Sequence, residues 1–454
     1  MAKSVFVVLA LFAAGVALAP AALGLSAAQG VVAAIALVTI GLWATGLLAE
    51  HLTSLTFFAI CSLLAIAPQE VIFAGFGSSA LWLVFGGLII GSAVGGTGLG
   101  KRLAGFGARY LPNSYRWLVH GVVMISFGFA FLMPSTIGRM MILLPIVMEL
   151  AESAGYRRQS HGWTALVLAS AMGTLFPPFA ILPANVPPAV LFGAMDTLYG
   201  ITPTYFGYLV LHLPVLGVVK AVVIGELLVR LFPDADAQVH AEGVAAPMSA
   251  AEKRLAAILA LALAFWASDA LHGIAPGWIA LGAAVLCLLP GIGVMPASDL
   301  ATRVNLMPAF YVAGVLGLGA VLADSGIGEK LSAGLMQTNP FIDGAVLFNA
   351  GVLTVIATGV GMLTTLPGIA ATLTPLAGSF TDLTGLPLMA VLMTQVIAFS
   401  ATMLPYQSPP LMVAFATAGV PLSTGTRAVL PLGIITLVVL MPLQLLWWRL
   451  IGFV

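Results

Sequence analysis

Charged residues are scarce in this chain. Only 7% of its 454 residues are Asp, Glu, Lys or Arg, whereas about 25% is usual for a soluble domain. Hydrophobic residues make up 61% and the mean hydropathy is +1.12, so the sequence predicts an integral membrane protein whose main partner is the lipid bilayer. The 16 basic and 16 acidic residues balance, and no nucleic-acid partner is expected.

Cysteine is almost absent as well. The two cysteines, Cys61 and Cys287, lie alone in apolar runs, which argues against a disulfide framework. The six histidines are scattered, without an HExxH motif or another metal-ligand spacing. No aspartate pair and no Ser/His arrangement falls at membrane depth. We therefore expect a protein that is not an enzyme and that carries no organic cofactor.

Proline occurs in an unusual arrangement. Residues 182–188 read LPANVPP and residues 404–410 read LPYQSPP, each between apolar runs long enough to lie inside a membrane. Such a stretch cannot continue a helix, because proline lacks an N–H and disfavours the α conformation of the preceding residue. Unwound backbone at membrane depth is tolerated only inside protein or beside a water-filled cavity. Two such breaks in matching halves are typical of a transporter's binding site.

Apolar runs of about 20 residues indicate the membrane-spanning helices. Two longer blocks, 117–151 and 342–380, are interrupted near their middle. Basic residues flank the first block on both sides, so it is predicted to enter the membrane and return, as a re-entrant hairpin or as two short spans. The remaining spans are expected at about 4–20, 30–49, 53–68, 79–98, 163–198 with its break, 205–231, 254–271, 275–293, 307–324, a broken helix from about 388, and 428–448, with amphipathic pieces at 101–111 and 328–336.

The hydrophilic stretch 233–253 is predicted to be a cytoplasmic linker between two repeats, 30–232 and 254–454. Residues 97–103 (TGLGKRL) resemble residues 325–331 (SGIGEKL), and Pro145 and Pro375 occupy matching places in the two interrupted blocks. With the proline motifs, these landmarks recur in the same order, and the charge pattern predicts opposite orientations. An inverted repeat follows. Residues 1–29 are expected to be a membrane helix and connector, with a signal peptide as the alternative.

The turns of the two interrupted blocks carry hydroxyls. Ser135 and Thr136 follow Pro134, and Thr364 and Thr365 stand at the matching turn. Helix N-terminal amides at such turns bind anions, although the same hydroxyls also cap helices. Arg139 follows the first turn, where a charge inside the membrane should face a cavity or a partner. It is a candidate anion ligand, or else a structural ion pair.

The two helix breaks each contain one side-chain amide, Asn185 in the first and Gln407 in the second, with Ser408 beside it. A lone Asn is usually a turn former, but matching amides in a repeated motif favour binding. Lys220 lies inside the span 205–231, and we expect it to pair with a neighbour such as Glu226 or to reach the membrane surface.

The chain resembles the divalent anion/sodium symporter family of dicarboxylate, citrate and sulfate transporters. The resemblance rests on residues 81–87 (LWLVFGG) leading to 98–102 (GLGKR), on 141–146 (MILLPI), and on the two proline-proline breaks. It implies about eleven transmembrane helices, two opposed re-entrant hairpins, a homodimer and elevator-type movement. It also implies substrate contacts at Pro187, Pro188, Pro409 and Pro410, and sodium near Ser135, Thr174, Thr365 and Ser408.

The chain departs from the family at both hairpin tips, where the family's Ser-Asn-Thr lacks its asparagine. We hypothesise that the guanidinium of Arg139 stands in for one bound cation and neutralises the anion directly. The sequence thus predicts an all-α secondary transporter of a small anion, di- or tricarboxylate or sulfate-like, multi-pass in the inner (plasma) membrane, with sodium as the candidate coupling ion. The alternatives are a sodium-independent exchanger or exporter, and a channel for a small solute.

Overall fold

The computed structural model describes residues 2–109, 111, 114–237, 247–327 and 340–454, and this part of the chain is helical without a β-strand. The first half contains α1 (Ala2–Leu18), α2 (Ala27–Thr45), α3 (Glu50–Leu63), α4 (Gln69–Ile72), α5 (Ser79–Thr97), α6 (Leu99–Arg109), α7 (Tyr115–Gly128), α8 (Thr136–Ser153), α9 (His161–Leu175), α10 (Val186–Tyr199), α11 (Tyr205–His212) and α12 (Lys220–Leu231).

The second half contains α13 (Ala250–Ala267), α14 (Asp269–His272), α15 (Pro276–Leu288), α16 (Asp299–Thr302), α17 (Met307–Asp324), α19 (Val346–Leu363), α20 (Leu366–Leu373), α21 (Ala377–Thr384), α22 (Leu388–Ser400), α23 (Pro409–Ala418), α24 (Leu422–Ile435) and α25 (Met441–Leu450). The predicted amphipathic piece 328–336 and the centre of the linker 233–253 lie outside the described residues.

Five helical stretches among the described residues are long and apolar enough to cross a membrane. Several shorter apolar helices, among them α2, α7, α15 and α19, accompany them. An all-helical membrane fold is therefore confirmed, whereas the number of eleven spans stays a prediction. The five long stretches are Ser79–Thr97, His161–Ala180, Tyr205–Leu231, Met307–Asp324 and Leu422–Leu450.

Both predicted breaks interrupt helices, and the first is longer than the sequence motif alone suggested. The α-helix α9 already ends at Leu175, because Pro177 and Pro178 follow, and 3-10 turns lead from there to α10. In the second half α22 ends at Ser400, and a 3-10 turn at Pro405–Gln407 precedes α23. Helix–turn–helix units precede each break, namely α7 with α8 and α19 with α20.

The last long span of each half carries a π-helical segment. In the first half it covers Leu213–Val219 and contains Pro214, and in the second it covers Thr436–Leu440 and directly precedes Met441 and Pro442. Proline removes one intrahelical hydrogen bond, and the wider turn accommodates the loss. The two halves thus share a distortion that apolar run length alone could not predict.

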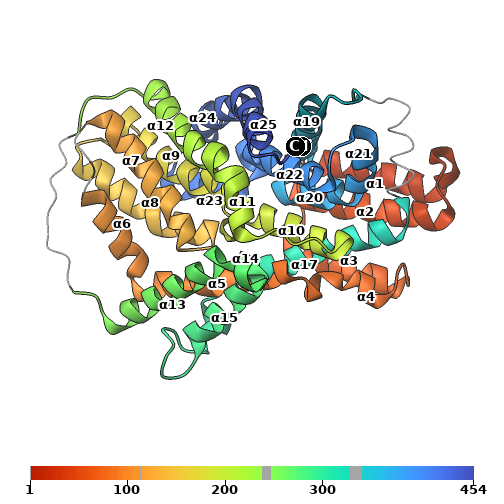
Figure 1. Ribbon diagram of the computed structural model, residues 1–454, viewed down its shortest axis with the longest axis horizontal. Coiled ribbons are helices and arrows are strands. Elements are labelled where there is room, and N and C mark those ends of the chain that lie inside the picture. Colours follow the sequence, from red (N-terminus) through yellow and green to blue (C-terminus); the bar gives the residue numbers. More distant parts are fainter. Residues whose placement is uncertain (1, 110, 112–113, 238–246, 328–339) are drawn as a thin grey trace.

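The helices are arranged in two layers (Figure 1). In the view of Figure 1, α3, α5, α13, α15 and α17 run along the lower side, and α7, α9, α12, α24 and α25 lie above them. Helix α10 lies between the layers and contacts α5, α17 and α20. Described residues of α9 after His161 are all buried, so this helix is enclosed by protein on every side.

Two helices of the lower layer approach unusually closely. Helices α5 and α15 contact each other along their length, and a Cβ added at Gly277 would lie 1.8 Å from the backbone oxygen of Ser79. Small residues at a membrane helix interface allow backbones to meet in this way. Gly282, on the same helix, has open space around the corresponding position.

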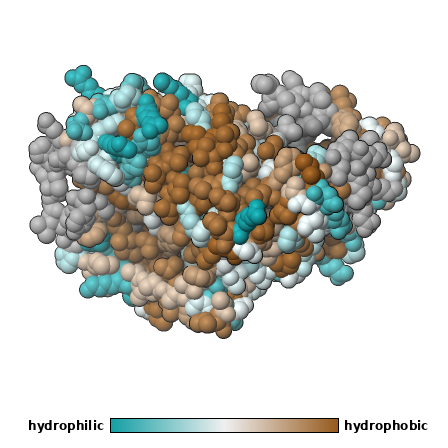
Figure 2. All heavy atoms as spheres, turned by 45° about the horizontal axis from the view of Figure 1, so that its top comes forward, coloured by the Kyte–Doolittle hydropathy of each residue, from teal (hydrophilic) through white to brown (hydrophobic). Residues whose placement is uncertain are grey.

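The surface carries many large apolar side chains, such as Leu11, Val222 and Val438, each more than half exposed. Figure 2 shows them as a broad apolar expanse, with hydrophilic side chains gathered mainly toward its edges. An apolar surface of this extent is unusual for a soluble monomer and fits contact with lipid.

Candidate functional site

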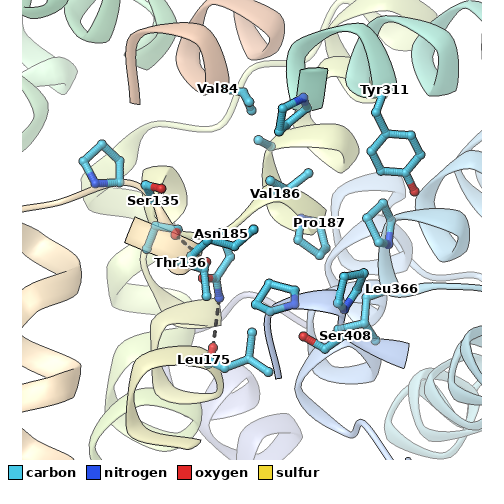
Figure 3. A pocket seen from close by; sticks show the side chains of 18 of the residues that line it. Val84, Ser135, Thr136, Leu175, Asn185, Val186, Pro187, Tyr311, Leu366 and Ser408 are labelled. Atoms are coloured by element: carbon cyan, nitrogen blue, oxygen red, sulfur yellow. Dashed lines mark hydrogen bonds between the residues drawn. The ribbon is translucent and has the colours of Figure 1, made fainter. Parts of the chain in front are cut away.

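A cavity of about 150 Å³ lies where the two hairpin turns meet the two helix breaks. Residues 134–137 and 365–367 line it from the turns, and residues 183–187 and 407–410 line it from the breaks. Figure 3 shows Ser135, Asn185 and Ser408 approaching it from these separate elements. A water needs roughly 10–15 Å³ of such space, so the cavity can hold a small molecule.

Four helices begin at this cavity. Thr136 starts α8, Val186 starts α10, Leu366 starts α20 and Pro409 starts α23, and all four residues line the cavity. The N-terminus of a helix carries a partial positive charge because its first amides have no intrahelical acceptor. Each half therefore contributes two positive helix ends to one space.

Proline reduces the number of hydrogen-bond donors at these ends. Pro187 in α10, Pro367 in α20, and Pro409 and Pro410 in α23 stand in the first turns and lack an N–H. The helix dipoles remain, while the surrounding lining is largely apolar and includes Leu83, Val84, Leu88 and Phe179. The cavity thus offers a positive potential with few fixed donors.

In the first half, Asn185 connects the break to the hairpin turn. Its side-chain oxygen accepts a hydrogen bond of 2.6 Å from the hydroxyl of Thr136, and its nitrogen donates to the backbone oxygen of Leu175 at 2.9 Å. Ser135 caps α8 by accepting from the backbone N–H of Gly138. These polar groups hold the two segments together and still border the cavity (Figure 3).

Arg139 lies behind this contact and is fully buried. Its guanidinium donates to the backbone oxygens of Met133 at 2.6 Å, Ala184 at 3.0 Å and Thr174 at 3.1 Å. It also donates to the side-chain oxygen of Asn185 at 3.0 Å. The fork is thus occupied by carbonyls that the turn and the break leave without helical partners.

The expected position of Arg139 at the cavity therefore needs correction. Arg139 is not among the described residues that line the cavity, and Thr136 and Asn185 stand between its contacts and the open space. The guanidinium donates instead to carbonyls of α9 and of the break that have no helical partner. Direct neutralisation of a bound anion by Arg139 is not supported by this geometry.

In the second half, Gln407 takes the same connecting role as Asn185. Its side-chain oxygen accepts from the backbone N–H groups of Met403 and Leu404 at 2.9 and 2.8 Å. Its nitrogen donates to the backbone oxygen of Gly361, near the end of α19, at 2.7 Å. The amide side chains at the matching positions of the repeated motif thus each connect a break to the hairpin of the same half.

Lys220 is a second fully buried basic side chain, and no acid pairs with it in the described part of the chain. Its ammonium donates to the backbone oxygen of Ser400, the last residue of α22, and to the hydroxyls of Ser400 at 2.7 Å and Thr436 at 3.0 Å. The expected ion pair with Glu226 is not formed, because Glu226 pairs with Arg116 and Arg230 instead. Lys220 therefore covers the C-terminal end of α22, as Arg139 covers that of α9.

The opposite wall of the cavity comes from helices that the sequence motifs did not indicate. Tyr311 of α17 points toward the cavity across from Ser408 (Figure 3), and its hydroxyl lies 3.2 Å from that of Thr365. Glu50, the first residue of α3, also lines this wall. Neither residue belongs to a repeated motif, so only the tertiary arrangement shows that they face the site.

Most of the predicted site residues meet at this cavity, and a few do not. Thr364 caps its own helix through a hydrogen bond to the backbone oxygen of Val360, and the hydroxyl of Thr174 is buried without a partner among the described residues. The residues that line the cavity are Ser135, Thr136, Asn185, Pro187, Thr365, Gln407, Ser408, Pro409 and Pro410, whereas Arg139, Thr174, Pro188 and Thr364 do not.

Two known proteins are similar to this chain over most of its length. A membrane protein of Cupriavidus necator is 26% identical over 400 residues, which cover 84% of this chain and 77% of that protein. The crystal structure of the YdaH transporter of Alcanivorax borkumensis has a similar fold, with a TM-score of 0.55 and 15% identity over 85% of this chain and 88% of that one.

The sequence profile described as "Sodium:sulfate symporter transmembrane region" matches residues 2–454. The cavity between two hairpin turns and two helix breaks thus lies in a chain that belongs to the sodium:sulfate symporter family of membrane transporters.

Proposed function

We propose that this protein is a secondary active transporter of a small anion, bound in the cavity between the two hairpin turns and the two helix breaks. The observation that carries the proposal is the asymmetry of the helix ends around this cavity. The N-termini of α8, α10, α20 and α23 face it. The C-terminal carbonyls nearby accept hydrogen bonds from Arg139, Asn185, Lys220 and Gln407 instead.

This arrangement gives the cavity a positive potential beside the helix N-termini, which favours binding of an anionic group there without a basic side chain in contact with it. Candidate anions are the di- and tricarboxylates and sulfate-like ions expected from the family. Transport would follow by elevator-type movement of the hairpins and broken helices against the lower layer, within a homodimer in the inner membrane. Re-entrant hairpins and inverted orientation of the repeats belong to the same proposal.

Arg139 favours sodium-independent exchange over sodium coupling. Its guanidinium binds three backbone oxygens at a turn and a break, which are ligands of the kind that a hard cation such as sodium would take. Because the guanidinium is already a fixed positive charge at this place, a bound sodium ion is less needed to balance the charge of the anion. Sodium coupling remains the competing form of the proposal, with Ser135, Thr365 and Ser408 as candidate contacts on the cavity side.

The test is counterflow of labelled succinate, citrate and sulfate in proteoliposomes, with sodium or potassium in the buffer. Ser408→Phe fills the cavity, and Leu446→Phe adds the same ring at an exposed apolar position as the matched control. We expect saturable counterflow in the wild type and the control, and none in Ser408→Phe. Equal counterflow in Ser408→Phe would refute this binding site.

Thermal shift gives an independent reading, because a ligand at about 100 times its Kd stabilises the folded state by about 2.7 kcal/mol. Counterflow at the same rate in sodium and in potassium would support sodium-independent exchange, with Arg139 in the place of a bound sodium ion. A steep dependence on sodium would instead establish sodium coupling.

A further inference from the structure

Glu50 is an acidic side chain in a cavity that otherwise suits anions. Among the described residues that line the cavity, it is the only acid, and none is Lys, Arg or His. Tyr311 and Thr365 provide hydroxyls nearby, and the remaining polar lining belongs to Ser, Thr, Asn and Gln side chains. Glu50 therefore sets the charge of the wall opposite the breaks.

The position of Glu50 is well defined by the aromatic residues around it. The indole N–H of Trp43 donates to the backbone oxygen of Glu50 at 3.1 Å. The Trp43 ring packs edge-on against Tyr311, with 5.4 Å between ring centroids. Helices α3 and α17 also pack against each other, so Glu50 and Tyr311 belong to the same wall.

A structural role at the start of α3 explains the location of Glu50 but not its lack of partners. An acid in the first turn complements the positive helix end. Two buried first-turn acids of this protein, by contrast, are hydrogen-bonded: Asp269 accepts from the backbone N–H of Tyr205, and Glu252 accepts from Arg102. No hydrogen bond or ion pair to the Glu50 carboxylate is found within the described part of the chain, and its side chain is half-buried.

The cavity lining combines groups of opposite electrostatic character. Four helix N-termini attract the anionic group of a ligand, whereas the carboxylate of Glu50 repels a second anionic group and attracts a donor. In a largely apolar cavity this repulsion is only weakly screened. A ligand with one anionic end and one cationic end satisfies both kinds of group at once.

We propose that Glu50 makes this cavity selective for an organic acid that also carries an ammonium group, such as an aminocarboxylate or aminosulfonate, over a dianion of the same size. This inference rests on the proposed function, since it assumes that the cavity binds the transported solute, and it puts ammonium-bearing acids ahead of the dianions expected from the family as the preferred ligands. The carboxylate of Glu50 accepts the ammonium N–H donors, and the carboxylate or sulfonate faces the helix N-termini at the two breaks.

The test compares matched ligands by thermal shift and counterflow: β-alanine, butyrate and malonate, and taurine with 1,2-ethanedisulfonate. Each is measured on the wild type, on Glu50→Gln, and on Glu50→Asp, which keeps the charge. Glu70→Gln serves as control, because Glu70 is likewise a first-turn acid but lies exposed and away from the cavity.

We expect the wild type to bind β-alanine and taurine about tenfold more tightly than the dianions, which corresponds to one charge-assisted hydrogen bond. We expect this preference to be lost in Glu50→Gln, kept in Glu50→Asp and unchanged in Glu70→Gln. Wild type that prefers dianions, or Glu50→Gln that keeps the wild-type order of ligands, overturns the inference while the proposed anion site stands. Absence of binding and counterflow for every ligand, succinate, citrate and sulfate included, overturns both.

Discussion

The guanidinium of Arg139 donates a hydrogen bond to the backbone oxygen of Thr174, 3.1 Å away, and thereby links the first hairpin to the end of α9. The same side chain also reaches backbone oxygens of Met133 and Ala184. One residue thus satisfies carbonyls from three segments that proline has removed from regular helix. The oxygen of Met133 also accepts from the backbone N–H of Ser135, and that of Ala184 also accepts from the hydroxyl of Thr136. In a low-dielectric interior the loss of a donor to any of these carbonyls is costly.

Replacing Arg139 by Ala should therefore destabilise the protein strongly. At least three buried carbonyls lose a donor, and we expect a loss of about 3 kcal/mol or more in the free energy of unfolding. Thermal unfolding in detergent measures it. Arg116→Ala is the control, because Arg116 is exposed and pairs with Glu226 at the surface, where about 1 kcal/mol or less is expected. Equal effects of the two substitutions would contradict this role.

The contact between α5 and α15 makes a prediction about two glycines of one helix. A methyl group at Gly277 would meet the backbone oxygen of Ser79 at 1.8 Å, so Gly277→Ala must push the two helices apart and should cost about 1–3 kcal/mol. Gly282→Ala adds the same methyl group into open space and should be neutral or stabilising by up to about 1 kcal/mol. Thermal unfolding of both variants tests this, and a similar stability of the two would show that the close approach is absent.

The stability of the protein should depend on the charge of Glu252. Arg102 binds this carboxylate at 2.7 Å, and together with the backbone N–H of Ser249 it lowers the pKa of Glu252 from 4.5 to about 2. Because the folded-state pKa lies below the unfolded one, this contribution is fully present above about pH 5. It is lost as the pH falls toward 2.

Glu252→Gln removes this contribution at neutral pH and leaves little to lose in acid. The difference in melting temperature between the wild type and Glu252→Gln should hence be largest near pH 7 and shrink as the pH is lowered from 5 to 3. A difference that stays constant over this range would mean that the contact with Arg102 does not depend on ionisation.

The features that sequence alone could predict are those set by local chemistry. Prolines in LPANVPP and LPYQSPP prevent a preceding helix from continuing through them, although they are tolerated in the first turn of the next one, so both breaks were predictable from the sequence. The end of α9 at Leu175 had a signal in Pro177 and Pro178, which stood outside the repeated motif. The hydroxyls of Ser135 and Thr365 followed from the same local reasoning about turns.

The features that sequence could not predict depend on contacts between distant segments. A charge at membrane depth indicated a polar partner for Arg139, but the choice between cavity and carbonyls depended on how the first break folds over the hairpin. Tyr311 and Glu50 reach the cavity only because α17 packs against α10 and α20, and α3 packs against α17. No spacing of residues in the sequence predicts this packing of the helices.

The ammonium of Lys220 joins the closing span of the first half to Ser400 at the end of α22 and to Thr436 in the π-helical segment of the second half. A buried cation held by partners from both repeats resists separation, since water does not reach it to replace them. The broken helix of the second half and the final spans of both halves are consequently fastened to one another. In the proposed transport cycle these parts would therefore move together, with the hinges elsewhere in the chain.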